Sequence, residues 1–213
     1  MTSTPPAGFW AQATADPDRP VLTAPDGEHW TAGRLHAAAN RLVHGLRAAG
    51  LERGDAFAVV LPNGVEFLTA YLAASQAGFY LVPVNHHFVG PEIGWIVADS
   101  GAKVLIAHDR FAGPARHAAD EAGLPATHRY AVGEVEGFRP YAELLDGQPA
   151  SAPSDRELGW VMNYTSGTTG RPRGIRRPLP GKLPEEAYLG GFLGIFGIRP
   201  FGDNVHLVCS PLY

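Results

Sequence analysis

The chain has 213 residues, of which 45% are hydrophobic and 18% are charged, and its formal net charge is −4. This composition is ordinary for a globular protein, and the length suits one large hydrophobic core better than two. A mildly acidic chain with dispersed arginines lacks the basic patch that a general nucleic-acid-binding protein would carry. We therefore expect no nucleic-acid partner.

Three features of the sequence bear on the cellular compartment of the protein. Cys209 is the only cysteine, so the chain cannot form an internal disulfide, which favours a reducing compartment. The N-terminus lacks the cationic start and long apolar run of a secretory signal. The most apolar segment, residues 188–198, is about half as long as a membrane-spanning helix. We expect a cytoplasmic protein with no membrane span.

Helical and extended patterns alternate as far as residue 132. Short apolar runs beside turn residues predict strands, whereas apolar residues recurring at helical spacing predict helices. Thr31 is a good N-cap for the second helix, and Gly78 suits the C-terminus of the third. The expected helices are 7–15, 35–49, 65–77, 91–99 and 111–122, and the expected strands are 21–24, 28–30, 56–61, 79–84, 103–107 and 128–132. This alternation predicts an α/β fold with a largely parallel sheet flanked by helices.

The remainder of the chain is less regular. Residues 133–157 contain three prolines and little periodicity beyond residues 141–145, so we expect an irregular surface connection. Residues 158–162 predict a short strand that leads into a loop, and residues 174–177 could form its returning partner. Pro184 and the two acids after it suit the first turn of a helix. The apolar run 205–209 predicts a buried strand.

The loop between the strand and its returning partner carries the chemistry. Residues 164–174 read YTSGTTGRPRG, which is rich in glycine and hydroxyl side chains. Such a loop has little side-chain bulk, so its backbone N–H groups can converge on an anion while its hydroxyls donate beside them. Arg171 and Arg173 add charge and forked donors that suit phosphate oxygens.

The alternative interpretation is a flexible surface linker, because tracts of glycine, serine and threonine often serve that purpose. A linker needs neither a buried strand before it nor Pro172 between two arginines after it. The loop is not a Walker A sequence, because no Lys-Ser or Lys-Thr follows Gly170, and it does not match GxGxxG. The pattern favours phosphate binding over a linker.

The same loop resembles the signature sequence of the adenylate-forming superfamily, which includes acyl-CoA synthetases, luciferases and peptide-synthetase adenylation domains. The superfamily usually has lysine where this chain has Arg173, and the rest of the signature matches. Residues 77–85, AGFYLVPVN, are similar to a second superfamily segment that precedes the loop. Asn85 at its end tilts the comparison weakly toward acyl-CoA synthetases, since peptide-synthetase domains tend to have aspartate there.

The resemblance implies a function for the intact protein. It implies activation of a carboxylic acid, fatty or otherwise apolar, by ATP with Mg²⁺ through an acyl-adenylate, followed by transfer to coenzyme A. The residues that it implies for phosphate binding are Thr165, Ser166, Gly167, Thr168, Thr169, Gly170 and Arg173. One alternative is a peptide-synthetase or aryl-acid adenylation domain, and a second is a non-catalytic fragment that serves as a folding or partner-binding unit.

The resemblance covers only the beginning of the superfamily's sequence. It implies that residues 1–213 are an incomplete N-terminal portion of the AMP-binding large domain, without the C-terminal lid domain. Lys103 and Lys182, the only lysines, match no catalytic position, so the catalytic residues are not identified. We therefore expect this chain alone to be inactive and to self-associate through the edge at residues 205–209.

No metal site is expected within this chain. His86 and His87 are adjacent, and on an extended segment their side chains would point to opposite sides. No cysteine or carboxylate is spaced to complete a site with them.

Overall fold

A computed structural model describes residues 8–165, 171–187, 197–198 and 204–213. Its centre is a six-stranded sheet in which every strand pair is parallel. The strand order is β7-β6-β5-β3-β4-β8. The strands are β3 (Ala56–Val60), β4 (Tyr80–Pro83), β5 (Ala102–His108), β6 (Arg129–Val132), β7 (Arg139–Pro140) and β8 (Trp160–Val161). The predicted α/β fold with a parallel sheet is confirmed.

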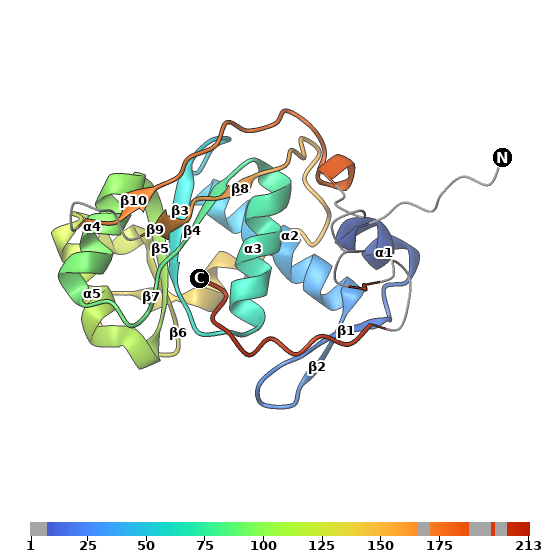
Figure 1. Cartoon of the computed structure of the whole chain (residues 1–213), viewed down its shortest axis with the longest axis horizontal. Coiled ribbons are helices and arrows are strands. Elements are labelled where there is room, and N and C mark those ends of the chain that lie inside the picture. Colours follow the sequence, from blue (N-terminus) through green and yellow to red (C-terminus); the bar gives the residue numbers. More distant parts are fainter. Residues whose placement is uncertain (1–7, 166–170, 188–196, 199–203) are drawn as a thin grey trace.

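Two pairs of helices cover the two faces of the sheet (Figure 1). The pair α2 (Ala32–Ala48) and α3 (Val65–Ala77) lies on one face, and the pair α4 (Gly90–Ser100) and α5 (Ala112–Glu121) lies on the other. Because both faces are covered, all five residues of β3 are buried. The structure is thus a three-layer arrangement with one continuous sheet in the middle.

The sequence explains where α2 and α3 begin and end. Thr31 precedes α2, and its side-chain oxygen accepts a hydrogen bond from the backbone N–H of Arg34, which is the expected N-cap. Gly78 ends α3 in the left-handed conformation with φ of 67°, a backbone geometry that disfavours a side chain.

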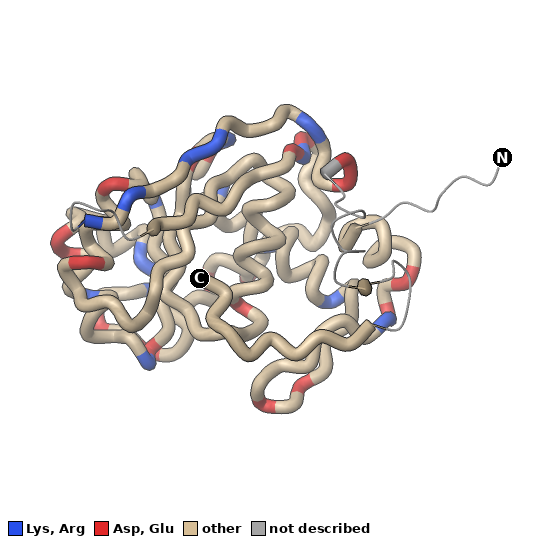
Figure 2. Tube along the Cα trace, viewed as in Figure 1, with Lys and Arg blue, Asp and Glu red and all other residues tan. Residues whose placement is uncertain are grey.

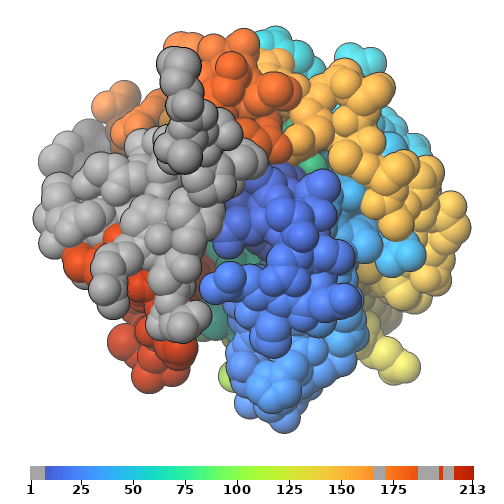
Figure 3. Space-filling view, turned by 90° about the vertical axis from the view of Figure 1, so that its right-hand side faces the viewer, coloured from blue at the N-terminus to red at the C-terminus, as the bar shows by residue number. Residues whose placement is uncertain are grey.

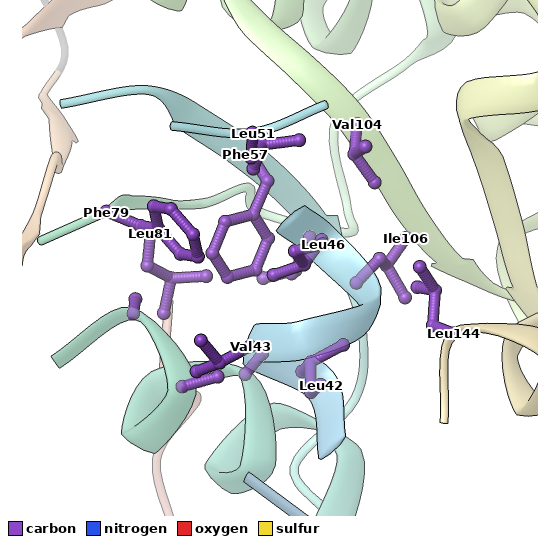
Figure 4. Packing of buried hydrophobic residues seen from close by; sticks show 14 of the residues in the cluster. Leu42, Val43, Leu46, Leu51, Phe57, Phe79, Leu81, Val104, Ile106 and Leu144 are labelled. Carbon is purple, nitrogen blue, oxygen red and sulfur yellow. The ribbon is translucent and has the colours of Figure 1, made fainter. Parts of the chain in front are cut away.

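The core between the sheet and the pair α2 and α3 is tightly packed (Figure 4). Phe57 of β3 and Phe79 meet edge to face, with ring centroids 6.4 Å apart and an interplanar angle of 88°. Leu42, Val43 and Leu46 of α2 are fully buried against this sheet face. This packing buries the connection between α3 and β4. Strand β4 in turn pairs with β8, from which the predicted loop leaves.

Short elements complete the described structure. A helix α1 (Phe9–Ala15) and an antiparallel hairpin, β1 (Pro20–Thr23) with β2 (His29–Thr31), form a small cluster on the outside of α2. The connection between β7 and β8 runs beside this N-terminal cluster (Figure 3). It is also bound to α2, because the Asn40 side chain donates to the carbonyl oxygen of Ala150 over 2.7 Å. The remaining elements are the 3₁₀ helices η1 (Asp109–Phe111), η2 (Ala126–His128), η3 (Tyr141–Leu144) and η4 (Pro184–Ala187), and the strands β9 (Tyr164–Thr165) and β10 (Arg173–Gly174). No helix in the described ranges is long and apolar enough to cross a membrane.

The segment 133–157 is more ordered than its sequence predicts. Strand β7 adds a sixth member to the sheet, and η3 places Leu144 in the core at 2% exposure. The prediction of an irregular surface connection is therefore wrong for residues 139–144. The physical reason is that a two-residue strand shows no periodicity, and the periodicity of residues 141–145 extends over a single turn only.

The prediction of a buried strand at residues 205–209 is wrong. Val205 and Leu207 are 95% and 90% exposed, and residues 204–209 form no strand. A strand needs the backbone hydrogen bonds of a neighbour, and the described residues offer none there. The chain is held further on: the Asn63 side-chain amide donates to the Ser210 carbonyl over 2.9 Å, and its oxygen accepts from the Leu212 N–H over 3.0 Å.

Candidate phosphate-binding site

Strand β8 brings the chain to the candidate site. The backbone N–H of Trp160 donates to the Phe79 carbonyl over 3.0 Å, and that of Met162 donates to the Leu81 carbonyl over 2.8 Å. Just before β8, a Cβ at Gly159 would lie 2.1 Å from the Ala74 carbonyl oxygen, so only glycine fits between β8 and the end of α3. The edge of the parallel sheet therefore fixes the point from which the loop leaves.

The two ends of the predicted loop pair as a short antiparallel hairpin. In β9 and β10, Thr165 lies opposite Arg173, and Tyr164 lies opposite Gly174. The Ile175 N–H extends the ladder by donating to the Asn163 carbonyl over 3.1 Å. A strand before the loop and a returning strand after it are confirmed, but the returning strand is β10 (Arg173–Gly174), not residues 174–177. It pairs with β9 and not with the predicted strand at 158–162, because β8 in that segment pairs with β4.

The middle of the predicted site lies outside the described residues. Ser166, Gly167, Thr168, Thr169 and Gly170 belong to this part, and their phosphate-binding roles stay predictions. Of the predicted site residues, the structure describes Thr165 and Arg173 and brings them together across the base of the loop.

Helix α4 contacts both ends of the loop through two residues that sequence reasoning missed. The Tyr164 hydroxyl donates to the Asp99 carboxylate over 2.7 Å. The indole N–H of Trp95 donates to the Pro172 carbonyl over 3.3 Å, and the Arg171 guanidinium lies over the Trp95 ring, 4.5 Å from its centroid. Trp95 and Asp99 are four residues apart, which places them on one helix face. The sequence shows this shared face but not that it meets the loop.

The Tyr164 hydroxyl stays protonated under ordinary conditions. Burial raises the pKa of Tyr164 most, and the hydrogen bond to Asp99 raises it further. A neutral phenol is a hydrogen-bond donor, so the Tyr164–Asp99 contact persists across the neutral range. Its ring also packs against Gly174, where a Cβ would lie 2.7 Å from the ring carbon Cζ.

A cavity of about 360 Å³ opens beside the base of the loop. Arg173 is exposed there, and it forms no ion pair within the described part of the chain. The lining residues are Trp95, Asp99, Arg171, Pro172, Arg173 and Gly174. An unpaired guanidinium with forked donors is suited to a phosphate group.

A second cavity, about 510 Å³ in volume, lies between α2 and the β6–β7 edge and differs in its charges. Its arginine, Arg139, pairs with Glu143 over 2.7 Å and donates to the Tyr130 hydroxyl over 3.1 Å. Because the charge of this arginine is already neutralised, the loop cavity is the better place for an anion.

Basic residues continue along the chain beyond β10 (Figure 2). The Arg176 guanidinium lies over the Tyr80 ring, 4.4 Å from its centroid, and also donates to the Gly54 carbonyl. The Tyr80 hydroxyl donates to the Arg177 carbonyl over 2.6 Å. These contacts of Arg176 hold the segment against the start of β4. Because Arg176 already has these partners, Arg173 is the better candidate to bind phosphate.

The expectation that His86 and His87 point to opposite sides is wrong. Their ring centroids are 4.5 Å apart. The reason is a turn: the Asn85 side chain accepts a hydrogen bond from the His87 N–H over 2.8 Å, so the backbone is not extended. Over the described ranges, no three histidine, cysteine, aspartate or glutamate side chains gather in a way that could hold a metal ion.

Ligands of open parallel sheets bind beyond the carboxyl ends of the strands, and a glycine-rich loop there can bind phosphate through its backbone N–H groups. The chain belongs to the AMP-binding enzyme family, whose sequence model matches residues 9–180. The resemblance to the adenylate-forming superfamily is therefore confirmed.

Individual relatives agree with this assignment. The chain is 33% identical over 169 residues to the long-chain-fatty-acid–CoA ligase FadD13 of Mycobacterium tuberculosis, covering 77% of this chain and 33% of that protein. It is 32% identical over 163 residues to surfactin synthase subunit 2 of Bacillus subtilis, covering 74% of this chain and 4% of that protein. Among solved structures, a putative long-chain-fatty-acid CoA ligase from Rhodopseudomonas palustris matches with a TM-score of 0.65 and 29% identity, over 78% of this chain and 42% of that one. The chain thus spans about a third of the length of FadD13.

Proposed function

We propose that the intact protein uses ATP to activate a carboxylic acid, a fatty acid in the first place, as an acyl-adenylate and then transfers the acyl group to coenzyme A. The observation that carries this proposal is the arrangement at the base of the loop. Thr165 and Arg173 lie opposite each other in the hairpin, and the Arg173 charge is unpaired within the described structure. The likeness to a long-chain-fatty-acid–CoA ligase supports the choice of acid and acceptor.

In the first half-reaction, a carboxylate oxygen of the acid attacks the α-phosphorus of ATP. The bond from that phosphorus to the bridging oxygen breaks, and pyrophosphate leaves with the electron pair. In the second half-reaction, the thiol of coenzyme A loses its proton and attacks the acyl carbon, and AMP leaves. The first step builds negative charge on the departing pyrophosphate, so hydrogen-bond donors and fixed positive charge near it lower the barrier.

The residues assigned to that task fit the chemistry. Backbone N–H groups and hydroxyls of Thr165, Ser166, Gly167, Thr168 and Thr169 would donate to the β- and γ-phosphates, next to Gly170, and Arg173 would neutralise charge. Arg173 in place of the superfamily's lysine keeps the positive charge but cannot give up a proton. Bound Mg²⁺ would neutralise further charge on the phosphate oxygens, and we assign no residue of this chain to it.

Two alternatives stay open. A peptide-synthetase or aryl-acid adenylation domain would share the first half-reaction, and the likeness to surfactin synthase subunit 2 favours it. A non-catalytic folding or partner-binding unit would have no reaction. We also keep the proposals that residues 1–213 are an N-terminal portion without the lid domain, that this portion alone is inactive, and that the protein is cytoplasmic.

The products separate these possibilities. The intact protein is incubated with ATP, Mg²⁺ and a panel of fatty, aryl and amino acids, first without and then with coenzyme A or a phosphopantetheinyl carrier protein. The proposal expects AMP and pyrophosphate, and an acyl-CoA thioester from a fatty acid. Loading of the carrier protein but not of coenzyme A would favour the adenylation domain, and absence of AMP with every acid would contradict adenylation.

A further inference from the structure

One face of α4 holds both ends of the phosphate loop. Tyr164, on the incoming side, donates its hydroxyl proton to the Asp99 carboxylate over 2.7 Å. Pro172, on the outgoing side, accepts from the Trp95 indole N–H over 3.3 Å. Arg171, also on the outgoing side, covers the Trp95 ring at 4.5 Å. We call these five residues the α4 clamp.

The α4 clamp is anchored on a rigid support. Ile93, Ile96 and Val97 on the opposite side of α4 are at most 1% exposed and pack into the sheet core. The helix is therefore held against the sheet independently of the loop. Trp95 and Asp99 fix the two ends of the loop from one rigid surface, in addition to the hairpin ladder of β9 and β10.

The two arginines of the loop differ in their contacts and therefore in the roles that we assign to them. The Arg171 guanidinium lies against Trp95, whereas Arg173 faces the cavity with no ion pair in the described part of the structure. Arg171 thus contributes to holding the outgoing end, and Arg173 is free to meet an anion.

We infer that Trp95 and Asp99 are positioning residues that pre-organise the loop for the triphosphate of ATP. This inference rests on the proposed function. A loop whose ends are already fixed loses less conformational freedom on binding, so more of the phosphate contact energy is realised as affinity. Loosening the ends should therefore weaken ATP binding without changing the chemistry of the bound complex or the binding of the acid.

The test uses acid-dependent ATP–pyrophosphate exchange by the intact enzyme. Asp99→Ala and Tyr164→Phe each remove the same hydrogen bond, whereas Asp99→Asn keeps an oxygen that can accept from Tyr164. We expect the two disruptive variants to raise KM for ATP about fivefold to tenfold, while kcat and KM for the acid stay within about twofold. The double variant should be no worse than either single variant, because the two singles remove one shared contact.

Two controls make the result specific. Asp99→Asn keeps a hydrogen-bond acceptor for Tyr164, so its KM for ATP should lie within about twofold of the wild-type value. Asp155→Ala removes a carboxylate that pairs with Arg47 of α2, on the sheet face opposite α4 (Figure 1), and should leave KM for ATP unchanged.

The outcomes distinguish the inference from the proposed function. An unchanged KM for ATP in Asp99→Ala, Tyr164→Phe and Trp95→Phe, which lacks the indole N–H, would overturn the clamp alone if the enzyme exchanges pyrophosphate normally. A parallel loss of kcat and of both KM values, not rescued by Asp99→Asn, would show a merely structural role and would also overturn it. Absence of exchange in the wild type with every acid would contradict the proposed function, and the positioning role would fall with it.

Discussion

Gly45 of α2 and Leu144 of η3 approach each other so closely that a Cβ at position 45 would lie 1.8 Å from the Leu144 carbonyl oxygen. The contact joins the second helix to the segment that follows β7, and it allows the Leu144 side chain to enter the core. A side chain at position 45 would push this backbone away, because a carbonyl oxygen cannot give way as a flexible side chain can.

Two glycine-to-alanine substitutions in helices should therefore differ in their effect on stability. Gly45→Ala should lower the free energy of unfolding by about 1–3 kcal/mol through overpacking. Gly113, in the first turn of α5, has open space around it but precedes Pro114, so Gly113→Ala should change that free energy by less than about 0.5 kcal/mol. Urea unfolding of both variants checks this, and a stabilising Gly45→Ala would contradict the close approach.

A second prediction concerns acid pH and the ion pair between Arg53 and Glu157. The Glu157 carboxylate accepts from the Arg53 guanidinium over 2.7 Å, and this hydrogen bond holds the pKa of Glu157 below its ordinary value of 4.5. Because the unfolded chain takes up the proton at a higher pH than the folded chain, the pair's contribution is present above about pH 4.5 and is lost as pH falls through the lower folded pKa. The wild type should lose more stability than Glu157→Gln between neutral pH and about pH 3.

The matched control is Glu136→Gln. Glu136 pairs with Arg116 but its side chain is 79% exposed, so the pair is worth little. The pH profile of Glu136→Gln, measured by urea unfolding, should follow that of the wild type. Parallel profiles for Glu157→Gln and the wild type would show that the Arg53 pair does not contribute.

A third prediction concerns self-association of the 213-residue chain. The expected buried strand at 205–209 is absent from the described structure, but Val205 and Leu207 expose apolar side chains at 95% and 90%. Apolar surface of this kind favours contact with a second copy. We expect the apparent mass in light scattering to rise with concentration and the double variant Val205→Ser/Leu207→Ser to reduce this rise. A wild-type chain that stays monomeric at high concentration would contradict the prediction.

A fourth prediction separates the charge of Arg173 from its shape. Arg173→Lys keeps the positive charge and should retain most acid-dependent pyrophosphate exchange, whereas Arg173→Ala should reduce it by about tenfold or more. Arg116→Ala, which removes an exposed arginine on α5, is the control and should leave exchange unchanged. Wild-type exchange in Arg173→Ala would show that the Arg173 side chain does not contribute to phosphate binding.

The elements that the sequence predicts well are those with a local signal. Helix α2 has a side-chain cap at Thr31 and a continuous apolar stripe, and α3 ends at Gly78 as expected. Strand β3 is a run of apolar residues between polar ones, and it lies fully buried in the sheet. In each of these, the sequence within one element determines its type.

The features that could not be predicted depend on partners distant in the chain. Strand β7 consists of an arginine and a proline, and it is a strand only because β6 is beside it. Residues 205–209 have a strand-like sequence without a described partner, and so they form no strand. Trp95 and Asp99 reach the loop through tertiary contacts, which a helical pattern alone does not reveal.

Acid-dependent ATP–pyrophosphate exchange by the intact enzyme, with and without the hydroxyls of Thr168 and Thr169, tests the central claim most directly. If residues 164–174 bind the triphosphate, Thr168→Ala/Thr169→Ala should lose at least about tenfold in exchange rate, because each hydrogen bond to a charged phosphate is worth about 1.5–3 kcal/mol. Ser151→Ala/Ser154→Ala removes two hydroxyls from exposed residues before β8 and should exchange at the wild-type rate. Exchange that is unchanged in Thr168→Ala/Thr169→Ala would contradict the assignment of this loop as the phosphate site.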